Sequence, residues 1–260
     1  MRWCKPSWWG PRASRSSQAV AAFRATLERP RTPGGDGEAQ RKIARGMRPA
    51  GGAKLRSHLI ERTRFFDEQV LGALDAGVAQ VVILGAGYDD RALRFSAPGV
   101  RYFEVDQPAT QADKRRRLAR LRADFDSVVL LSADFRSDDV AAALTAAGHD
   151  VTAPSLFICE GLLIYLDEPT NISLLAALRT RAAPDSRLAA SLAVHPDGED
   201  STSVVASANA IRHHSAREPW LTILPVAGQI ALLERAGWSL SESSNAVGGM
   251  LCVLARPAAG

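Results

Sequence analysis

Long apolar runs are missing from this chain of 260 residues. A membrane-spanning helix needs about 18 consecutive apolar residues, and the nearest approach is the short stretch at residues 78–86. The first 15 residues are interrupted by Pro6, Gly10 and Pro11, and they lack the apolar segment of a secretory signal. We therefore expect a protein of the cytoplasm without a membrane partner.

Cysteines and metal-binding patterns are also scarce. Cys4, Cys159 and Cys252 are odd in number and far apart, so they predict reduced side chains rather than disulfides or a zinc site. The five histidines show no His-Glu-x-x-His pattern or other metal-ligand spacing. The sequence predicts no metal centre.

Acidic residues are absent before Glu28, although the whole chain carries a net charge of only +4. Residues 1–27 hold five Lys and Arg, which leaves the remaining chain at a net charge of −1. The excess basic charge therefore belongs to the start of the chain, where we expect residues 1–15 to be disordered. The charge of the remaining chain does not favour a nucleic-acid partner.

The chain does contain an alternation of short β-branched runs with helical segments. Helical spacing covers residues 20–27, behind a cap at Ser16 or Ser17 and up to Pro30, and residues 53–74. The alternation predicts a parallel sheet covered on both faces by helices. Strands are expected at 80–84, 101–105, 127–131, 155–159, 187–194, 238–242 and 249–256, and further helices at 108–122, 138–147, 169–183 and 226–236.

This pattern predicts one domain over residues 16–260. Residues 16–76 would form a helical cap before the first strand. Residues 195–225 interrupt the alternation with Pro196, Gly198, Pro219 and polar residues, so we interpret them as an inserted lid over the substrate.

A glycine-rich turn follows the first predicted strand, at Gly85-Ala86-Gly87. Such turns let a nucleotide approach the backbone at the carboxyl ends of parallel strands. A dinucleotide fingerprint would have Gly or Ala where this chain has Asp90, and a second acid, Asp89, makes the turn unsuitable for a pyrophosphate. Asp106 lies 21 residues after Gly85, where a carboxylate grips ribose hydroxyls. An adenosine ligand without phosphates, such as S-adenosylmethionine, agrees with these residues.

Four ordered motifs then resemble the leucine carboxyl methyltransferase family. They are QVVILGAGYDDRALR from Gln80, YFEVDQP from Tyr102, Asp134-Phe135-Arg136 and EGLLIYL from Glu160. The resemblance implies a class I methyltransferase: a doubly wound, mostly parallel, Rossmann-like α/β sheet of seven strands with an antiparallel last strand, N-terminal helices and a lid. It also implies S-adenosylmethionine as cofactor and O-methyl transfer as the activity.

The resemblance assigns roles to individual residues. Gly85 would lie against the methionine part, Asp106 would hold the ribose, Asp134 and Phe135 would flank the adenine, and Glu160 would face the methionine. Arg62 would pair with the cofactor carboxylate, with Arg64 as the competing assignment. The full expected cofactor-binding set is Arg62, Gly85, Ala86, Gly87, Asp106, Gln107, Asp134, Phe135 and Glu160. Ile83 departs from many methyltransferases, which carry an acid there for the methionine ammonium.

The methyl acceptor is left open by the sequence. A carboxylate is already ionised at neutral pH and needs only positioning, for example by Arg24 or Arg212. A hydroxyl needs a base within hydrogen-bond reach, for which Tyr165, His195 and His213 are the catalytic candidates. A small molecule is the expected acceptor, and a protein C-terminus is the alternative.

Six bases within residues 114–122 raise a non-enzymatic alternative, a nucleic-acid-binding module on a methyltransferase fold. No aromatic residues are interleaved with these bases to stack on nucleotides. We therefore interpret the run as the solvated face of a helix.

Overall fold

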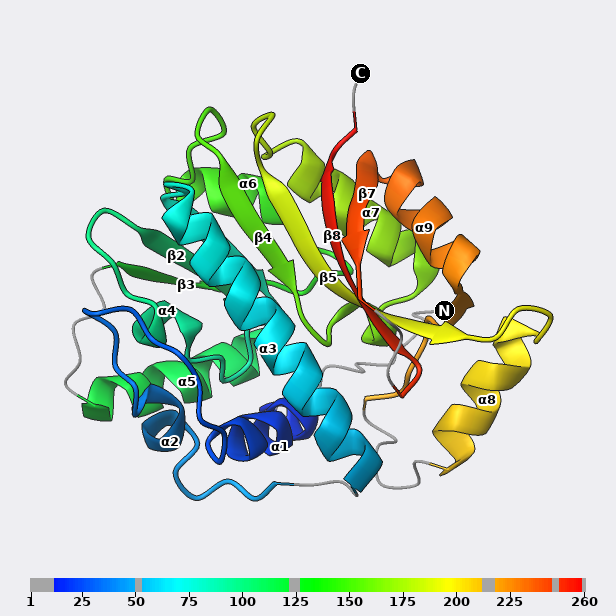
Figure 1. Ribbon diagram of the computed structural model, residues 1–260, viewed down its shortest axis with the longest axis horizontal. Coiled ribbons are helices and arrows are strands. Elements are labelled where there is room, and N and C mark those ends of the chain that lie inside the picture. Colours follow the sequence, from blue (N-terminus) through cyan, green and yellow to red (C-terminus); the bar gives the residue numbers. More distant parts are fainter. Residues whose placement is uncertain (1–11, 50–52, 122–126, 212–217, 245–247, 259–260) are drawn as a thin grey trace, which may run out of the picture.

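The computed structural model describes residues 12–49, 53–121, 127–211, 218–244 and 248–258, and its centre is a large mixed sheet (Figure 1). The strand order is β3-β2-β1-β4-β5-β8-β7. All neighbours from β3 to β5 are parallel, and β8 is antiparallel to both β5 and β7. The predicted doubly wound, mostly parallel sheet is therefore confirmed. The strands are β1 (Gln80–Leu84), β2 (Arg101–Asp106), β3 (Val128–Ser132), β4 (Ser155–Cys159), β5 (Arg187–His195), β7 (Trp238–Ser243) and β8 (Met250–Pro257), while the two-residue β6 (Leu224–Pro225) pairs with the end of β5.

Helices cover both faces of the sheet. The long helix α3 crosses one face in Figure 1, and α6, α7 and α9 lie behind the other. Toward the β3 edge, α1, α2 and α5 pack on the same side as α3. Their bounds are α1 (Arg15–Arg24), α2 (Ala39–Ile43), α3 (Ala53–Asp75), α4 (Arg91–Arg94), α5 (Pro108–Leu121), α6 (Val140–Ala146), α7 (Glu168–Arg179), α8 (Ser201–Ile211) and α9 (Val226–Arg235), with a short 3-10 helix, η1 (Leu163–Tyr165).

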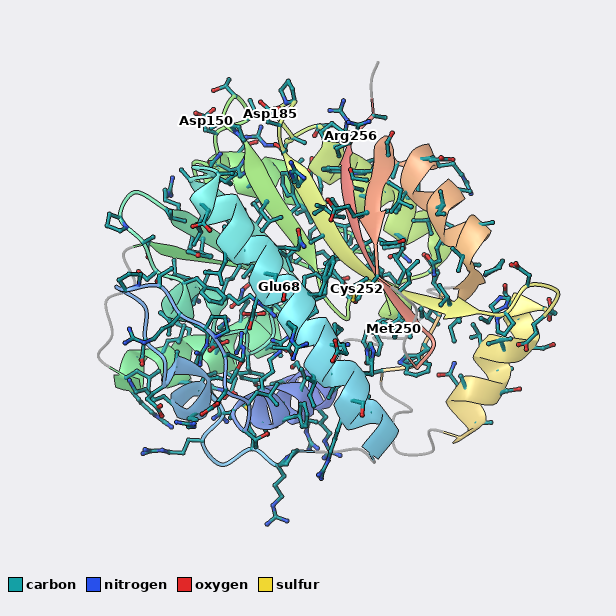
Figure 2. All side chains as sticks on the ribbon, viewed as in Figure 1. Glu68, Asp150, Asp185, Met250, Cys252 and Arg256 are labelled. Carbon is teal, nitrogen blue, oxygen red and sulfur yellow. The ribbon has the colours of Figure 1, made fainter. Side chains whose placement is uncertain are left out.

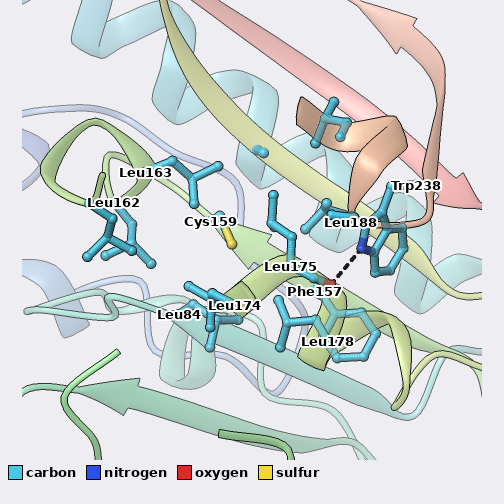
Figure 3. Close-up of a cluster of buried hydrophobic side chains, with 14 of the residues drawn as sticks. Leu84, Phe157, Cys159, Leu162, Leu163, Leu174, Leu175, Leu178, Leu188 and Trp238 are labelled. Atoms are coloured by element: carbon cyan, nitrogen blue, oxygen red, sulfur yellow. Dashed lines mark hydrogen bonds between the residues drawn. The ribbon is translucent and has the colours of Figure 1, made fainter. Parts of the chain in front are cut away.

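Alternation along each strand explains why the sheet has two buried faces. Val81 and Ile83 contribute to the core under Phe66 of α3, whereas Val82 and Leu84 contribute to the core under α6, α7 and α9. Successive side chains of a strand point to opposite faces, so a strand buried on both faces is apolar at most of its positions. The second core appears in Figure 3, where the buried Trp238 donates from Nε1 to the carbonyl oxygen of Leu175 at 2.9 Å.

The observed elements correct two details of the prediction. The cap of α1 is Ser14, not Ser16 or Ser17, because the Ser14 hydroxyl accepts from the Ser17 amide at 3.1 Å and the helix already ends at Arg24. The predicted lid region contains an eleven-residue helix, α8, that the sequence pattern did not indicate. Residues 1–11 of the start expected to be disordered lie outside the described residues, whereas Ser14 and Arg15 belong to the folded chain.

Two further expectations concern absences. Among the described residues, no helix is both long enough and apolar enough to cross a bilayer. Cys159 and Cys252 are buried free thiols, and Cys4 lies outside the described part of the chain.

Candidate active site

The glycine turn and Asp106 meet at the carboxyl ends of β1 and β2. These strands are parallel neighbours with Leu84 opposite Val105, so the residues that follow them come together. The Gly87 amide donates to Asp106 Oδ2 at 2.6 Å, and the Gln107 amide donates to Oδ1 at 2.7 Å. Burial raises the pKa of the Asp106 carboxyl to about 6, although both amide hydrogen bonds favour its ionised form.

Both glycines of the turn have positive φ, 64° at Gly85 and 50° at Gly87. A Cβ at Gly85 would lie 3.0 Å from the Leu162 side chain, and one at Gly87 would lie 2.8 Å from Ser17 Cβ in α1. The first turn of α1 therefore packs directly on the glycine turn. The glycines are needed for this close approach as well as for the backbone conformation.

Glu160 follows β4 and is the centre of an ion-pair cluster. Its carboxylate pairs with Arg24 of α1, with Arg62 of α3 at 2.9 Å and with Arg91 of α4 at 2.7 Å. Burial by itself would raise the pKa of the Glu160 carboxyl, but the three guanidinium groups outweigh burial and lower it well below its usual range. Arg64, the competing assignment for Arg62, is exposed and lies 3.9 Å from Glu61.

The cluster extends to the acids of the glycine turn. Arg29 joins Asp67 and Asp90 at 2.7 and 2.6 Å, and Arg91 joins Asp67 and Asp89 at 2.8 and 2.5 Å. Burial would raise the pKa of the Asp90 carboxyl, but attraction to Arg29 and Arg94 lowers it to about 2. Together the cluster holds five guanidinium groups and four carboxylates, a surplus of one positive charge: Arg24, Arg29, Arg62, Arg91 and Arg94 against Asp67, Asp89, Asp90 and Glu160.

This arrangement corrects two interpretations made from the sequence. Asp89 and Asp90 are buried and paired with arginines, so they do not present free negative charge to a ligand. Arg24, considered for an acceptor carboxylate, lies in the same cluster, 6% exposed, and its buried Nε has no hydrogen-bond partner among the described residues. Its guanidinium faces the Glu160 side of the site.

The basic run of α5 is only partly solvated. Lys114 is 1% exposed and pairs with Glu104 of β2. It also donates to the Asp89 carbonyl at 2.7 Å and so stabilises the end of the glycine turn. Arg117 pairs with Asp113 at 2.9 Å. The interpretation of this run as a solvated face holds for Arg116, which is exposed, and is wrong for Lys114.

Two predicted adenine contacts follow β3. The Ala133 amide donates to the Asp106 carbonyl at 3.0 Å, which ties this loop to the glycine-turn side of the sheet. Asp134 is half-buried and accepts from the Arg136 amide at 3.1 Å. Phe135 is buried and belongs to the core that also contains Leu162.

Two of the three expected catalytic residues, Tyr165 and His195, lie on the α8 side. Tyr165 of η1 is half-buried against the cluster formed by Ile164, Ala193 and Ile223, on which α8 also packs. His213 lies outside the described residues, as do Arg212 and His214.

His195 ends β5, four residues beyond Ser191, whose hydroxyl accepts from the Gly161 amide at 2.7 Å. At about 3.3 Å per strand residue, His195 is therefore roughly 13 Å along β5 from the Glu160 level. A carbonyl only accepts, so His195 Nδ1 donates to Pro196 O at 2.8 Å, and Nε2 accepts from the Ser201 hydroxyl at 2.7 Å. Nε2 thus ties the start of α8 to the end of β5, while the Nδ1 contact to Pro196 is local.

Nothing in the sequence indicated Glu218, a residue that joins the α8 side of the molecule to the first turn of α1. Glu218 Oε2 accepts from the Ser16 amide in the first turn of α1 at 3.1 Å, although 202 residues separate them. No local pattern could have identified this pair. By contrast, the Asp90–Arg94 pair has helical i, i+4 spacing and could have been predicted.

Sequence comparison finds that residues 19–179 match the profile of a family described as leucine carboxyl methyltransferase. A "Putative S-adenosyl-L-methionine-dependent methyltransferase" of Mycolicibacterium gilvum is 32% identical over 216 residues, covering 81% of this chain and 70% of that protein. A protein of the same name from Mycobacterium avium is 42% identical over 145 residues, covering 55% of this chain and 46% of that protein. The match thus spans about half of the Mycobacterium avium relative.

Solved structures share the fold at low sequence identity. A "putative methyltransferase" from Thermobifida fusca superposes with a TM-score of 0.61 at 16% identity, covering 100% of both chains. Magnesium protoporphyrin IX methyltransferase from Synechocystis, solved with bound SAH, gives a TM-score of 0.55 at 14% identity, covering 85% of this chain and 94% of that chain.

Proposed function

The chain belongs to the leucine carboxyl methyltransferase family, and from this premise we propose that it is an S-adenosylmethionine-dependent O-methyltransferase acting on a carboxylate or hydroxyl of a small molecule. The observation that carries the proposal is the position of Asp106. Its carboxylate lies against the glycine turn, beside a buried cluster that offers both an acid and arginines. These are the groups that a nucleoside attached to an amino acid requires.

We assign the ribose end of the cofactor to Asp106, to Gln107 beside it and to the glycine turn, Gly85-Ala86-Gly87. A carboxylate that already accepts two amide hydrogen bonds is held rigidly, and its remaining lone pairs can accept from two adjacent hydroxyls. The Gly87 amide is engaged by Asp106, so it is not free to bind a phosphate. This supports adenosine rather than a dinucleotide as the ligand.

The methionine end is assigned to Arg62 and Glu160. An amino-acid zwitterion could insert into this ion pair, with its carboxylate on Arg62 and its ammonium on Glu160. Every buried charge would keep a partner, because Arg91 still holds the other oxygen of Glu160.

The chemistry follows from alignment. The bound cofactor would supply a methyl group on a positively charged sulfur, and the protein has to hold the acceptor oxygen in line with it in a dry site. Asp106 and Arg62 would fix the two ends of the cofactor. Leu162 packs on Gly85 and would exclude water from the space between the two ends of the cofactor.

The acceptor would approach from the α8 side, where Tyr165 lies. A carboxylate acceptor would need no base. For a hydroxyl acceptor, Tyr165, His195 and His213 remain our candidates for proton removal. His195 would first have to release Ser201, because its Nε2 accepts that hydrogen bond.

Calorimetry with S-adenosylhomocysteine and with NADH tests this function directly. We expect a one-to-one complex with S-adenosylhomocysteine and no heat with NADH. Binding of NADH instead would contradict the proposal. Methyl transfer from labelled cofactor to a panel of carboxylic acids, phenols and alcohols would then identify the acceptor, and transfer to none but nitrogen acceptors would contradict O-methylation.

A further inference from the structure

Glu218 connects the α8 side of the molecule, from which we propose that the acceptor approaches, to helix α1 beside the glycine turn. It lies two residues before Trp220, which is held by Asn209 of α8 through both its amide and its carbonyl, at 2.9 and 2.8 Å. The Leu221 amide donates to the Ile164 carbonyl at 2.7 Å. Glu218 therefore stands on a well-anchored part of the chain.

From that base, Glu218 reaches the first turn of α1. Its carboxylate accepts from the Ser16 amide at 3.1 Å, one of the helix amides that have no partner inside the helix. A negative charge at this end of a helix also interacts favourably with the helix dipole. The same turn is held from another direction, since the Ser14 amide donates to Thr110 Oγ1 at 3.1 Å.

The turn of α1 that Glu218 contacts packs over Asp106, the carboxylate that we assign to the ribose. Ser17 packs on Gly87, and the Gly87 amide donates to Asp106. Glu218 is also near enough for its charge to act on Asp106. Glu218, the first turn of α1, Gly87 and Asp106 thus form a continuous series of contacts.

We propose that Glu218 is a positioning residue for the cofactor: it fixes the first turn of α1 over the glycine turn, and so makes retention of the cofactor depend on the segment that borders the acceptor side. This inference rests on the proposed function for the identity of the ligand. The contact itself is independent of it. A substitution at Glu218 should release α1 even when no ligand is present.

Hydrogen exchange of the ligand-free protein tests the contact. We expect Glu218→Ala to accelerate exchange of the amides in α1, whereas Glu218→Gln, whose amide oxygen can still accept from Ser16, should restore most of the protection. Glu199→Ala is the matched control, because Glu199 is an exposed acid of the same insertion. Unchanged exchange in α1 of the Glu218→Ala protein would overturn the positioning role.

The dissociation rate of S-adenosylhomocysteine tests the link to the cofactor. Loss of a hydrogen bond to a charged group is expected to raise this rate roughly tenfold in Glu218→Ala, with a much smaller effect in Glu218→Gln and none in Glu199→Ala. An unchanged rate together with faster α1 exchange would overturn the link. If the wild-type protein bound no S-adenosylhomocysteine, the proposed function and the link would both fall, while the exchange experiment would still decide whether Glu218 holds α1.

Discussion

At the scale of single residues, buried carboxylates do two different jobs. Asp90 lies between the guanidinium groups of Arg29 and Arg94, which keep the pKa of its carboxyl below its usual range. Asp106 is held by two amides and no arginine, and burial raises its pKa to about 6. A group that is buried, ionised near neutral pH and paired only with amides retains capacity for a ligand. This contrast favours Asp106 as a ligand-binding residue and Asp90 as a structural one.

The first prediction concerns the affinity that Asp106 provides. Asp106→Ala should weaken S-adenosylhomocysteine binding more than tenfold, because two hydroxyls would lose a charged acceptor and each such hydrogen bond is worth about 1.5–3 kcal/mol. Calorimetry measures the dissociation constant. Asp185→Ala is the control, because this exposed acid lies just before β5, at the opposite ends of the parallel strands from Asp106 (Figure 2). Equal affinity of the Asp106→Ala and wild-type proteins would remove Asp106 from the site.

The second prediction is a pH dependence of the same binding. The ionised carboxylate accepts the hydroxyls, so affinity should fall as the pH drops through the raised pKa of about 6. Between pH 7 and pH 5 the ionised fraction of such a group falls about tenfold, and the dissociation constant should rise by a similar factor. Asp106→Asn cannot titrate and should bind weakly at both pH values. A wild-type dissociation constant that does not change over this range would contradict the assignment.

At the scale of elements, the sequence predicted the strands far better than it predicted the contacts between side chains of the candidate site. Strands β1 and β4 were placed at their observed bounds, because buried parallel strands are continuous apolar runs. The sequence also predicted that the glycine turn and Asp106 would serve one ligand, and the parallel strands before them do bring the two together.

The pairing of acids with arginines of distant elements could not be predicted in the same way. Arg24 and Glu160 are joined by packing between α1 and the end of β4, and this packing has no local signal in the sequence.

The third prediction tests how closely α1 approaches the glycine turn. Gly87→Ala and Gly99→Ala both place a side chain at positive φ, 50° and 77°, so each should lower the free energy of unfolding by about 1–2 kcal/mol. A Cβ at Gly99 meets nothing within 4 Å, whereas one at Gly87 lies 2.8 Å from Ser17 Cβ. Only Gly87→Ala should therefore displace α1 and weaken S-adenosylhomocysteine binding, by about tenfold for typical overpacking energies. Equal binding by the two variants would show that α1 is not needed over the turn.

At the scale of the whole molecule, the N-terminal helices share their core with the sheet rather than forming a separate cap. Ala21 of α1 and Ile43 of α2 belong to one buried cluster with Tyr88, Leu93 and Leu118 of the α/β body. The ion-pair cluster spans the same boundary through Arg24 and Glu160. Separating the helices would strand buried charges without partners, which costs several kcal/mol. The two parts should therefore be stable only together.

The final prediction is that the chain unfolds in urea as one cooperative unit. Far-UV circular dichroism reports mainly on the helices, whereas Trp238, a fully buried residue of β7 that donates to Leu175 of α7, contributes a fluorescence signal from the core of the sheet. Because α1 and α2 share a buried cluster with the body, the two transitions should coincide. Saturating S-adenosylhomocysteine should move both midpoints upward together, since a ligand that binds only the folded state stabilises all of it. Loss of helical signal at a lower urea concentration than the fluorescence change would instead indicate a cap that unfolds on its own.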